Sequence, residues 1–120
     1  MFDINLNSSN PVYIEIANTI IKMIINGSFK KHDKLPSIRS LSQSLSVNHN
    51  TVTRAYLELE HKGYIYSKPG MGMFVCENIE GLIKADNSRI IAEFSEKVKE
   101  LKEVGITEKE VIDIVKDLYL

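Results

Sequence analysis

Residues 35–63 read LPSIRSLSQSLSVNHNTVTRAYLELEHKG, and this stretch decides the fold. Ser37 can cap a helix, because its hydroxyl can accept a hydrogen bond from a backbone N–H in the first turn. A turn at Ser46-Val47 leads to a second helix, which Asn48 can cap and Gly63 can end. Two short helices joined by a turn of about three or four residues form a helix-turn-helix.

Each of these two helices has one apolar side at helical spacing. The sides are formed by Leu35, Ile38, Leu41 and Leu45 in the first helix and by Val52, Ala55, Tyr56 and Leu59 in the second. Upstream, another amphipathic helix is expected to begin at Pro11 and to end at Asn26-Gly27. Before it, Phe2, Ile4 and Leu6 alternate with polar residues, and this period of two predicts a short half-buried strand.

Two β-prone runs follow the helix-turn-helix. They occupy residues 64–68 and 73–76 and flank the Pro/Gly loop at 69–72, which predicts a hairpin. A hairpin directly after a helix-turn-helix makes a winged helix. We therefore expect a mainly α chain with a small β-hairpin: a winged helix-turn-helix domain at residues 1–77 and a helical dimerisation tail at 78–120.

The tail is expected to contain two short amphipathic helices with a break at Gly105. Thr107 and Glu110 have the spacing of a capping box at the start of the second helix. Such short helices can cover little more than each other, so their apolar faces need a partner, and an identical subunit is the simplest one. The residues expected at this dimer contact are Ile90, Ile91, Phe94, Val98, Leu101, Val111, Ile114, Val115 and Leu118.

Length and composition fit an ordinary globular protein. The 120 residues are 43% apolar and 26% charged, which excludes a mainly disordered chain, a collagen-like fibre and a disulfide scaffold. The apolar run at residues 20–25 is interrupted by Lys22 and is too short to cross a bilayer, and no signal peptide is evident. The lone Cys76 cannot form an internal disulfide, which fits the reducing cytoplasm.

The charge is distributed unevenly along the chain. The formal net charge is −1, but residues 1–77 hold eight basic and six acidic side chains, whereas residues 78–120 hold seven and ten. The positive charge concentrates at residues 29–68, with seven basic and three acidic side chains, a net of +4. Such sign asymmetry indicates an anionic partner for the first part, although a charged segment can also be an ordinary solvated face.

The second helix of the helix-turn-helix, which is the third helix of the chain, has a polar side that suits base recognition. At about 100° per residue, Asn50 and Arg54 lie opposite Val52, with Thr53 beside them. Asn pairs with adenine, Arg with guanine, and the Thr methyl with the thymine methyl. On an isolated helix this side would be plain surface, but inside a helix-turn-helix followed by a hairpin it favours reading of the DNA major groove.

Other residues are candidates for contacts to the DNA backbone. Arg39 can reach a phosphate, and the helix start at Ser37 attracts an anion, although Ser37 and Thr51 can also serve only as caps. The wing offers Lys68 and two glycines, whose alternative role is a tight turn. The full set of expected DNA-binding residues is Ser37, Arg39, Asn48, His49, Asn50, Thr51, Thr53, Arg54, Lys68, Gly70 and Gly72. Lys30, Lys31 and Lys34 form a charge run with at most a minor steering role.

Catalytic and metal chemistry are not indicated. The three histidines lack metal-ligand spacing with one another or with Cys76, and no nucleophile arrangement or phosphate-binding loop is recognisable. Cys76 is expected to be a packing residue; the alternative, a redox sensor, would lack a resolving cysteine. We therefore expect no enzyme activity, no cofactor and no metal.

The chain resembles the GntR family of bacterial transcriptional regulators. The residues that carry the resemblance lie in the family's order at 11–17, 35–39, 47–56, 59–65 and 70–75, including Leu-Pro-Ser-Ile-Arg, Asn-Thr-Val-Thr-Arg-Ala-Tyr and Gly-Met-Gly. The short two-helix tail is similar to the YtrA subfamily. A related branch, MocR, carries a large aminotransferase-like domain that is absent here, which argues against pyridoxal phosphate.

The resemblance implies a cytoplasmic repressor that binds a palindromic operator in double-stranded DNA as a homodimer. A small-molecule effector would have to bind at the dimer interface or between the two parts of the chain. The alternative from another class is a winged-helix module for protein–protein interaction without DNA binding, against which Asn50, Thr53 and Arg54 argue. RNA binding is disfavoured, because no exposed aromatic platform is evident.

Overall fold

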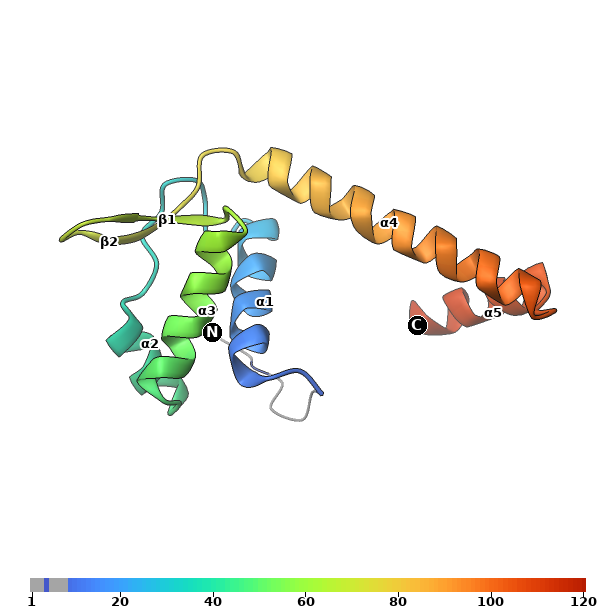
Figure 1. The fold of residues 1–120 in the computed structure, drawn as a ribbon, viewed down its shortest axis with the longest axis horizontal. Helices are drawn as coiled ribbons and strands as arrows, with labels where there is room; N and C mark the ends of the chain where they lie inside the picture. The colour runs from blue at the N-terminus through green and yellow to red at the C-terminus, as the bar shows by residue number, and fades with distance from the viewer. Residues whose placement is uncertain (1–3, 5–8) are drawn as a thin grey trace. The chain divides into compact units, whose positions relative to one another are not determined.

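The computed structural model describes Ile4 and residues 9–120. In chain order, the elements are α1 (Val12–Ile25), α2 (Ile38–Leu45), α3 (His49–His61), β1 (Ile65–Lys68), β2 (Gly72–Val75), α4 (Ile79–Glu103) and α5 (Glu108–Leu118) (Figure 1). The chain divides into two compact units, Met1–Ile83 and Lys84–Leu120. The fold is thus mainly helical with one small hairpin, as expected from the sequence.

The first unit is built around α3. This helix packs against α1 along one side, lies against α2 near its start, and leads directly into the hairpin (Figure 1). The core of the first unit contains side chains from α1, α2 and α3 and from both strands. The largest fully buried ones are Ile16, Ile20, Leu41, Val52, Leu59 and Val75. Burying each such side chain contributes roughly 1.5–3 kcal/mol, so this cluster dominates the stability of the unit.

The helix-turn-helix has the expected caps. The Ser37 hydroxyl accepts from the Ser40 N–H at 3.0 Å, and the Asn48 side-chain oxygen accepts from the Asn50 N–H at 2.7 Å. Between the two helices, Ser46 adopts the left-handed conformation with φ 54°. A non-glycine residue in this conformation costs roughly 1–2 kcal/mol, so the surrounding packing must hold the turn in place.

The hairpin is extended by a third segment. β1 and β2 are antiparallel, with Ile65 opposite Val75 and Lys68 opposite Gly72. In addition, Lys34 forms a single antiparallel bridge with Phe74. The connection between α1 and α2 is therefore hydrogen-bonded to the outer side of β2. Sequence patterning missed this pairing, because one bridge residue has no periodicity.

The expected N-terminal strand is only partly testable. Phe2 and Leu6 lie outside the described residues. Ile4 belongs to no strand and is half-buried against the core of the first unit. At this position the expectation of a strand is wrong, and the apolar side chain packs without strand pairing.

The tail helices differ from expectation in length. α4 has 25 residues and begins at Ile79, well before the apolar periodicity that starts at Ile90, so the expectation of two short helices is wrong for this one. Its first turns contribute Ile79, Leu82 and Ile83 to the apolar packing of the first unit. α5 carries the expected capping box. None of the described helices has an apolar stretch long enough to traverse a bilayer.

Candidate nucleic-acid interface

The polar side of α3 is open to solvent. Asn50 and Arg54 are exposed, whereas Val52 on the opposite side is fully buried. Thr53 is half-buried, and its hydroxyl donates to the backbone oxygen of His49 at 3.0 Å. This hydrogen bond directs the Thr53 hydroxyl toward its own helix. The helix therefore offers solvent an amide and a guanidinium, as the helical spacing predicts.

The start of α3 is exposed, and Asn48 already accepts from the N–H groups of Asn50 and Thr51. Asn48 and His49 are exposed and Thr51 is half-buried at the N-terminal end of the 13-residue helix. The aligned peptide dipoles place partial positive charge there, which favours a phosphate. The first turn contains no acidic residue that would oppose this.

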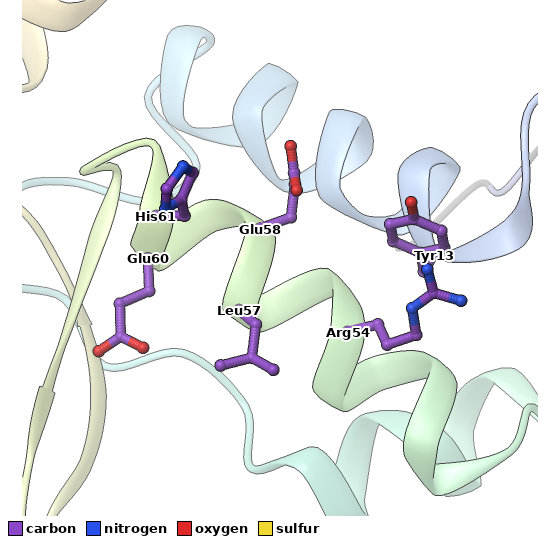
Figure 2. Close-up of a pocket in the computed structure, with 6 residues that line it drawn as sticks. All are labelled: Tyr13, Arg54, Leu57, Glu58, Glu60 and His61. Carbon is purple, nitrogen blue, oxygen red and sulfur yellow. The ribbon is translucent and has the colours of Figure 1, made fainter.

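Arg54 lies against an aromatic ring of the neighbouring helix. Its Cζ is 4.0 Å from the centroid of the Tyr13 ring on α1. Both side chains line a surface hollow of about 510 Å³, together with Leu57, Glu58, Glu60 and His61 (Figure 2). Nothing in the sequence pattern around Tyr13 indicated its contact with Arg54, which lies 41 residues further along the chain.

The entry to α2 is tied to α3. The Tyr56 hydroxyl donates to the backbone oxygen of Pro36 at 2.6 Å. Burial raises the pKa of Tyr56, so the hydroxyl keeps its proton and remains a donor. This contact fixes the position of Ser37 and Arg39, both of which are exposed at the beginning of α2.

The tip of the wing is a tight turn. Met71 N–H donates to the Lys68 carbonyl at 2.9 Å, and Gly70 has φ +74°. A proline at the second position and a glycine with positive φ at the third are typical of a type II turn. Lys68 is exposed, with its Nζ 5.1 Å from the centroid of the Phe74 ring.

Lys34 belongs to the wing rather than to a free charge run. A Cβ placed on Gly72 would lie 3.0 Å from Lys34 Cε, so the lysine stem passes directly over this glycine. Gly72 also has φ +116°, a conformation that disfavours other residues. The wing therefore carries two cations, Lys34 and Lys68.

Aromatic residues support the base of the wing. Tyr66 stacks on Phe74 with ring centroids 5.8 Å apart, and the Tyr66 hydroxyl is 2.8 Å from Nδ1 of His32.

Cys76, just beyond β2, is a half-buried free thiol whose pKa is raised by burial. No group of three or more potential metal ligands occurs among the described residues.

The second unit, taken by itself, exposes much apolar surface. Five of the nine residues expected at a dimer contact are exposed (Ile90, Ile91, Phe94, Ile114 and Leu118) and four are half-buried (Val98, Leu101, Val111 and Val115). A mainly apolar groove of about 450 Å³ runs between α4 and α5, with Val98, Ile106 and Val111 among its lining residues. Such surfaces commonly mark interaction sites.

Comparisons with known proteins agree with this geometry. The model of the bacterial regulatory proteins of the gntR family matches residues 12–75, which extend from α1 to the end of β2. The HTH-type transcriptional repressor YtrA of Bacillus subtilis (strain 168) is 36% identical over 93 residues, covering 78% of this chain and 72% of the relative.

Two solved structures are informative. A GntR family transcriptional regulator from Listeria monocytogenes superposes with a TM-score of 0.74 at 32% identity, covering 92% of this chain and 96% of that one. AraR(DBD), solved in complex with operator ORX1, has a TM-score of 0.54 at 30% identity and covers 56% of this chain and 81% of its own. The second similarity is to a protein solved in complex with an operator.

Proposed function

The chain belongs to the gntR family of bacterial regulatory proteins and is a DNA-binding transcriptional regulator; we propose that it represses transcription by binding a palindromic operator as a homodimer. The observation that carries this proposal is the exposed polar side of α3 within a complete helix-turn-helix and wing. We infer no catalytic role, and we place the protein in the cytoplasm, where bacterial operators are accessible.

We propose that α3 enters the major groove with its first two turns. Asn50 would pair with adenine and Arg54 with guanine, since these side chains match the donor and acceptor patterns of those bases. The Thr53 hydroxyl is engaged by its own helix, so we assign its methyl group a contact to a thymine methyl. This arrangement makes α3 the element that selects the sequence.

Backbone contacts would set the position of the domain on DNA. We assign phosphate contacts to the starts of α2 and α3 and to the wing, because these sites combine N–H groups, hydroxyls and cations. The residues are Ser37, Arg39, Asn48, His49, Thr51, Lys68 and the backbone at Gly70 and Gly72. We add Lys34, since its stem lies over Gly72. The net charge of +4 at residues 29–68 supports this assignment.

We propose that the tail forms the two-fold interface. Five large or branched apolar side chains of the expected contact set are exposed there, and burying each against an identical subunit would contribute roughly 1.5–3 kcal/mol. An isologous contact uses one patch twice, so a single sequence can complement itself. A two-fold dimer matches a palindrome whose half-sites are about one helical turn apart, or a multiple of it.

The proposal can be tested with the purified chain and fragmented genomic DNA. Bound fragments are selected, sequenced and footprinted, and the recovered sites are expected to contain an inverted repeat. Binding should weaken as salt rises, because phosphate contacts release counterions. Recovery of random fragments without a shared motif would contradict sequence-specific binding. Adding cell metabolites to a parallel selection reveals any effector that changes occupancy.

A further inference from the structure

We propose that Tyr13 is a positioning residue for DNA recognition, because the face of its ring holds the Arg54 guanidinium without accepting from its N–H donors as a carboxylate would. This inference rests on the proposed function, since it takes Arg54 as a contact to DNA. Tyr13 is not among the residues expected to bind DNA. The observation that implicates it is the 4.0 Å separation between Arg54 Cζ and the centroid of its ring.

The geometry is that of a cation–π contact. A guanidinium within about 6 Å of an aromatic centroid is attracted by the negative face of the ring. Tyr13 is half-buried in the first turn of α1, which packs along α3, whereas Arg54 is exposed (Figure 2). The ring is therefore held by the core, and the guanidinium that lies over it is accessible from solvent.

The type of contact matters for what Arg54 can still bind. A guanidinium carries five N–H donors, and an aromatic ring offers them no oxygen or nitrogen acceptor. An ion pair with a carboxylate would occupy them. In the part of the chain that the structure describes, Arg54 forms no ion pair, and Glu58, one turn further along α3, pairs with Lys62 at 3.6 Å. The donors of Arg54 therefore remain available for the acceptors of guanine.

Holding the side chain in place also improves binding. A free arginine samples many rotamers and loses that freedom when it docks, whereas an arginine already resting on a ring loses less. Tyr13 thus acts on affinity through Arg54, without a contact to DNA of its own. Substituting the ring is expected to weaken operator binding and to leave non-specific DNA binding nearly unchanged.

The test compares two substitutions in the full chain. Tyr13→Leu keeps an apolar side chain but removes the aromatic face, whereas Tyr13→Phe keeps the ring and removes only the hydroxyl. The probe is a duplex selected from a random pool by the purified parent protein. Tyr13→Leu is expected to weaken binding about 3- to 10-fold, the range of a partly exposed cation–π contact. Tyr13→Phe is expected to restore most of this loss.

A double-mutant cycle separates positioning from general structure. The Tyr13→Leu change is repeated in an Arg54→Ala background, where it should have no further effect on operator binding, because the group it positions is gone. Equal losses in both backgrounds, or parent-like binding by Tyr13→Leu, would overturn the inference. Thermal unfolding of each variant verifies that the fold is intact.

The proposed function fails on a different result. If the parent protein selects no duplex, sequence-specific DNA binding itself is wrong. If the parent selects a duplex and Arg54→Ala binds it equally well, Arg54 is not a DNA contact and the role of Tyr13 falls with it. If the parent selects a duplex and Arg54→Ala weakens its binding, but Tyr13→Leu binds like the parent, the positioning role alone is refuted.

Discussion

The Tyr56 hydroxyl on α3 donates a 2.6 Å hydrogen bond to the carbonyl oxygen of Pro36, the residue just before the cap of α2. The two residues are 20 positions apart in the sequence, so this bond sets a tertiary relationship between the two helices of the helix-turn-helix. It holds the start of α2, with Ser37 and Arg39, in a fixed place relative to the exposed side of α3.

Removing this hydroxyl should cost stability. Tyr56→Phe leaves the ring in place but strands the part-buried Pro36 carbonyl, and we expect a loss of about 1–3 kcal/mol in the free energy of unfolding. Urea denaturation measures this loss. Tyr66→Phe is a matched control, because it removes a hydroxyl whose hydrogen bond is exposed. A control that loses as much as Tyr56→Phe would show that burial of the bond is not the cause.

The same hydroxyl predicts a pH dependence. Burial raises the pKa of Tyr56 in the folded state above its ordinary value of about 10. Above that pH the unfolded chain releases the proton while the folded chain keeps it, so the free energy of unfolding falls as pH rises toward the folded pKa. Between about pH 10 and 11, the free energy of unfolding should fall less steeply with pH in Tyr56→Phe than in the parent protein. Identical slopes in the two proteins would contradict this.

Arg54→Ala is expected to weaken specific operator binding strongly, to a level that is still measurable, while leaving the chain folded. The loss of a guanine contact corresponds to at least about 1–3 kcal/mol of discrimination between operator and random DNA. Electrophoretic mobility shifts with both duplexes measure the discrimination. Lys62→Ala, which removes one exposed charge at the C-terminal end of the same helix, should retain it. A folded Arg54→Ala dimer that binds like the parent would make the groove assignment wrong.

Lys34 and Lys31 provide a matched pair for the wing. Lys34 lies over Gly72 near the tip of the wing, whereas Lys31 lines a hollow at the end of α1 and precedes His32, which is bonded to the last residue of β2. If Lys34 contacts a phosphate, Lys34→Ala should reduce the slope of log affinity against log salt by about one. Lys31→Ala removes the same charge and should change the slope much less. Equal changes would attribute the effect to net charge alone.

If the tail forms the proposed two-fold contact, Phe94→Glu should convert the dimer into a monomer. Phe94 is 51% exposed on α4, and a carboxylate there would be buried unpaired in a two-fold contact. Sedimentation velocity measures the expected halving of the mass, and operator affinity should fall with it. Ser95→Glu, one residue further along α4, adds the same charge as a control. If the Phe94→Glu protein remained dimeric, Phe94 would not lie in the interface.

The parts of the fold that sequence predicts well are those fixed by local chemistry. Ser37 and Asn48 are caps because their side chains bond to N–H groups two or three residues away, and Gly63 ends α3 at a positive φ. These signals lie within a few residues of the structure they specify. The exposed side of α3 followed equally directly from the helical period.

The missed features depend on residues that are distant in the sequence. Lys34 meets the wing through one bridge to Phe74, and Tyr13 meets Arg54 across two packed helices. Neither contact leaves a periodic trace. The early start of α4 has a different cause: the mostly polar residues 84–89 interrupt its apolar stripe, although Ile79 and Ile83 lie at helical spacing from Ile90.

The hydrogen bonds between β2 and the segment before α2 also bear on motion. Val75 donates to Asp33 and accepts from His32, and Leu35 donates to Met73, all at 2.8–2.9 Å. A two-stranded hairpin alone is only marginally stable in water. Because these bonds bind it to the α1–α2 connection, the hairpin cannot fray independently of that connection. The tip of the wing therefore opens only together with the α1–α2 connection, as one cooperative unit.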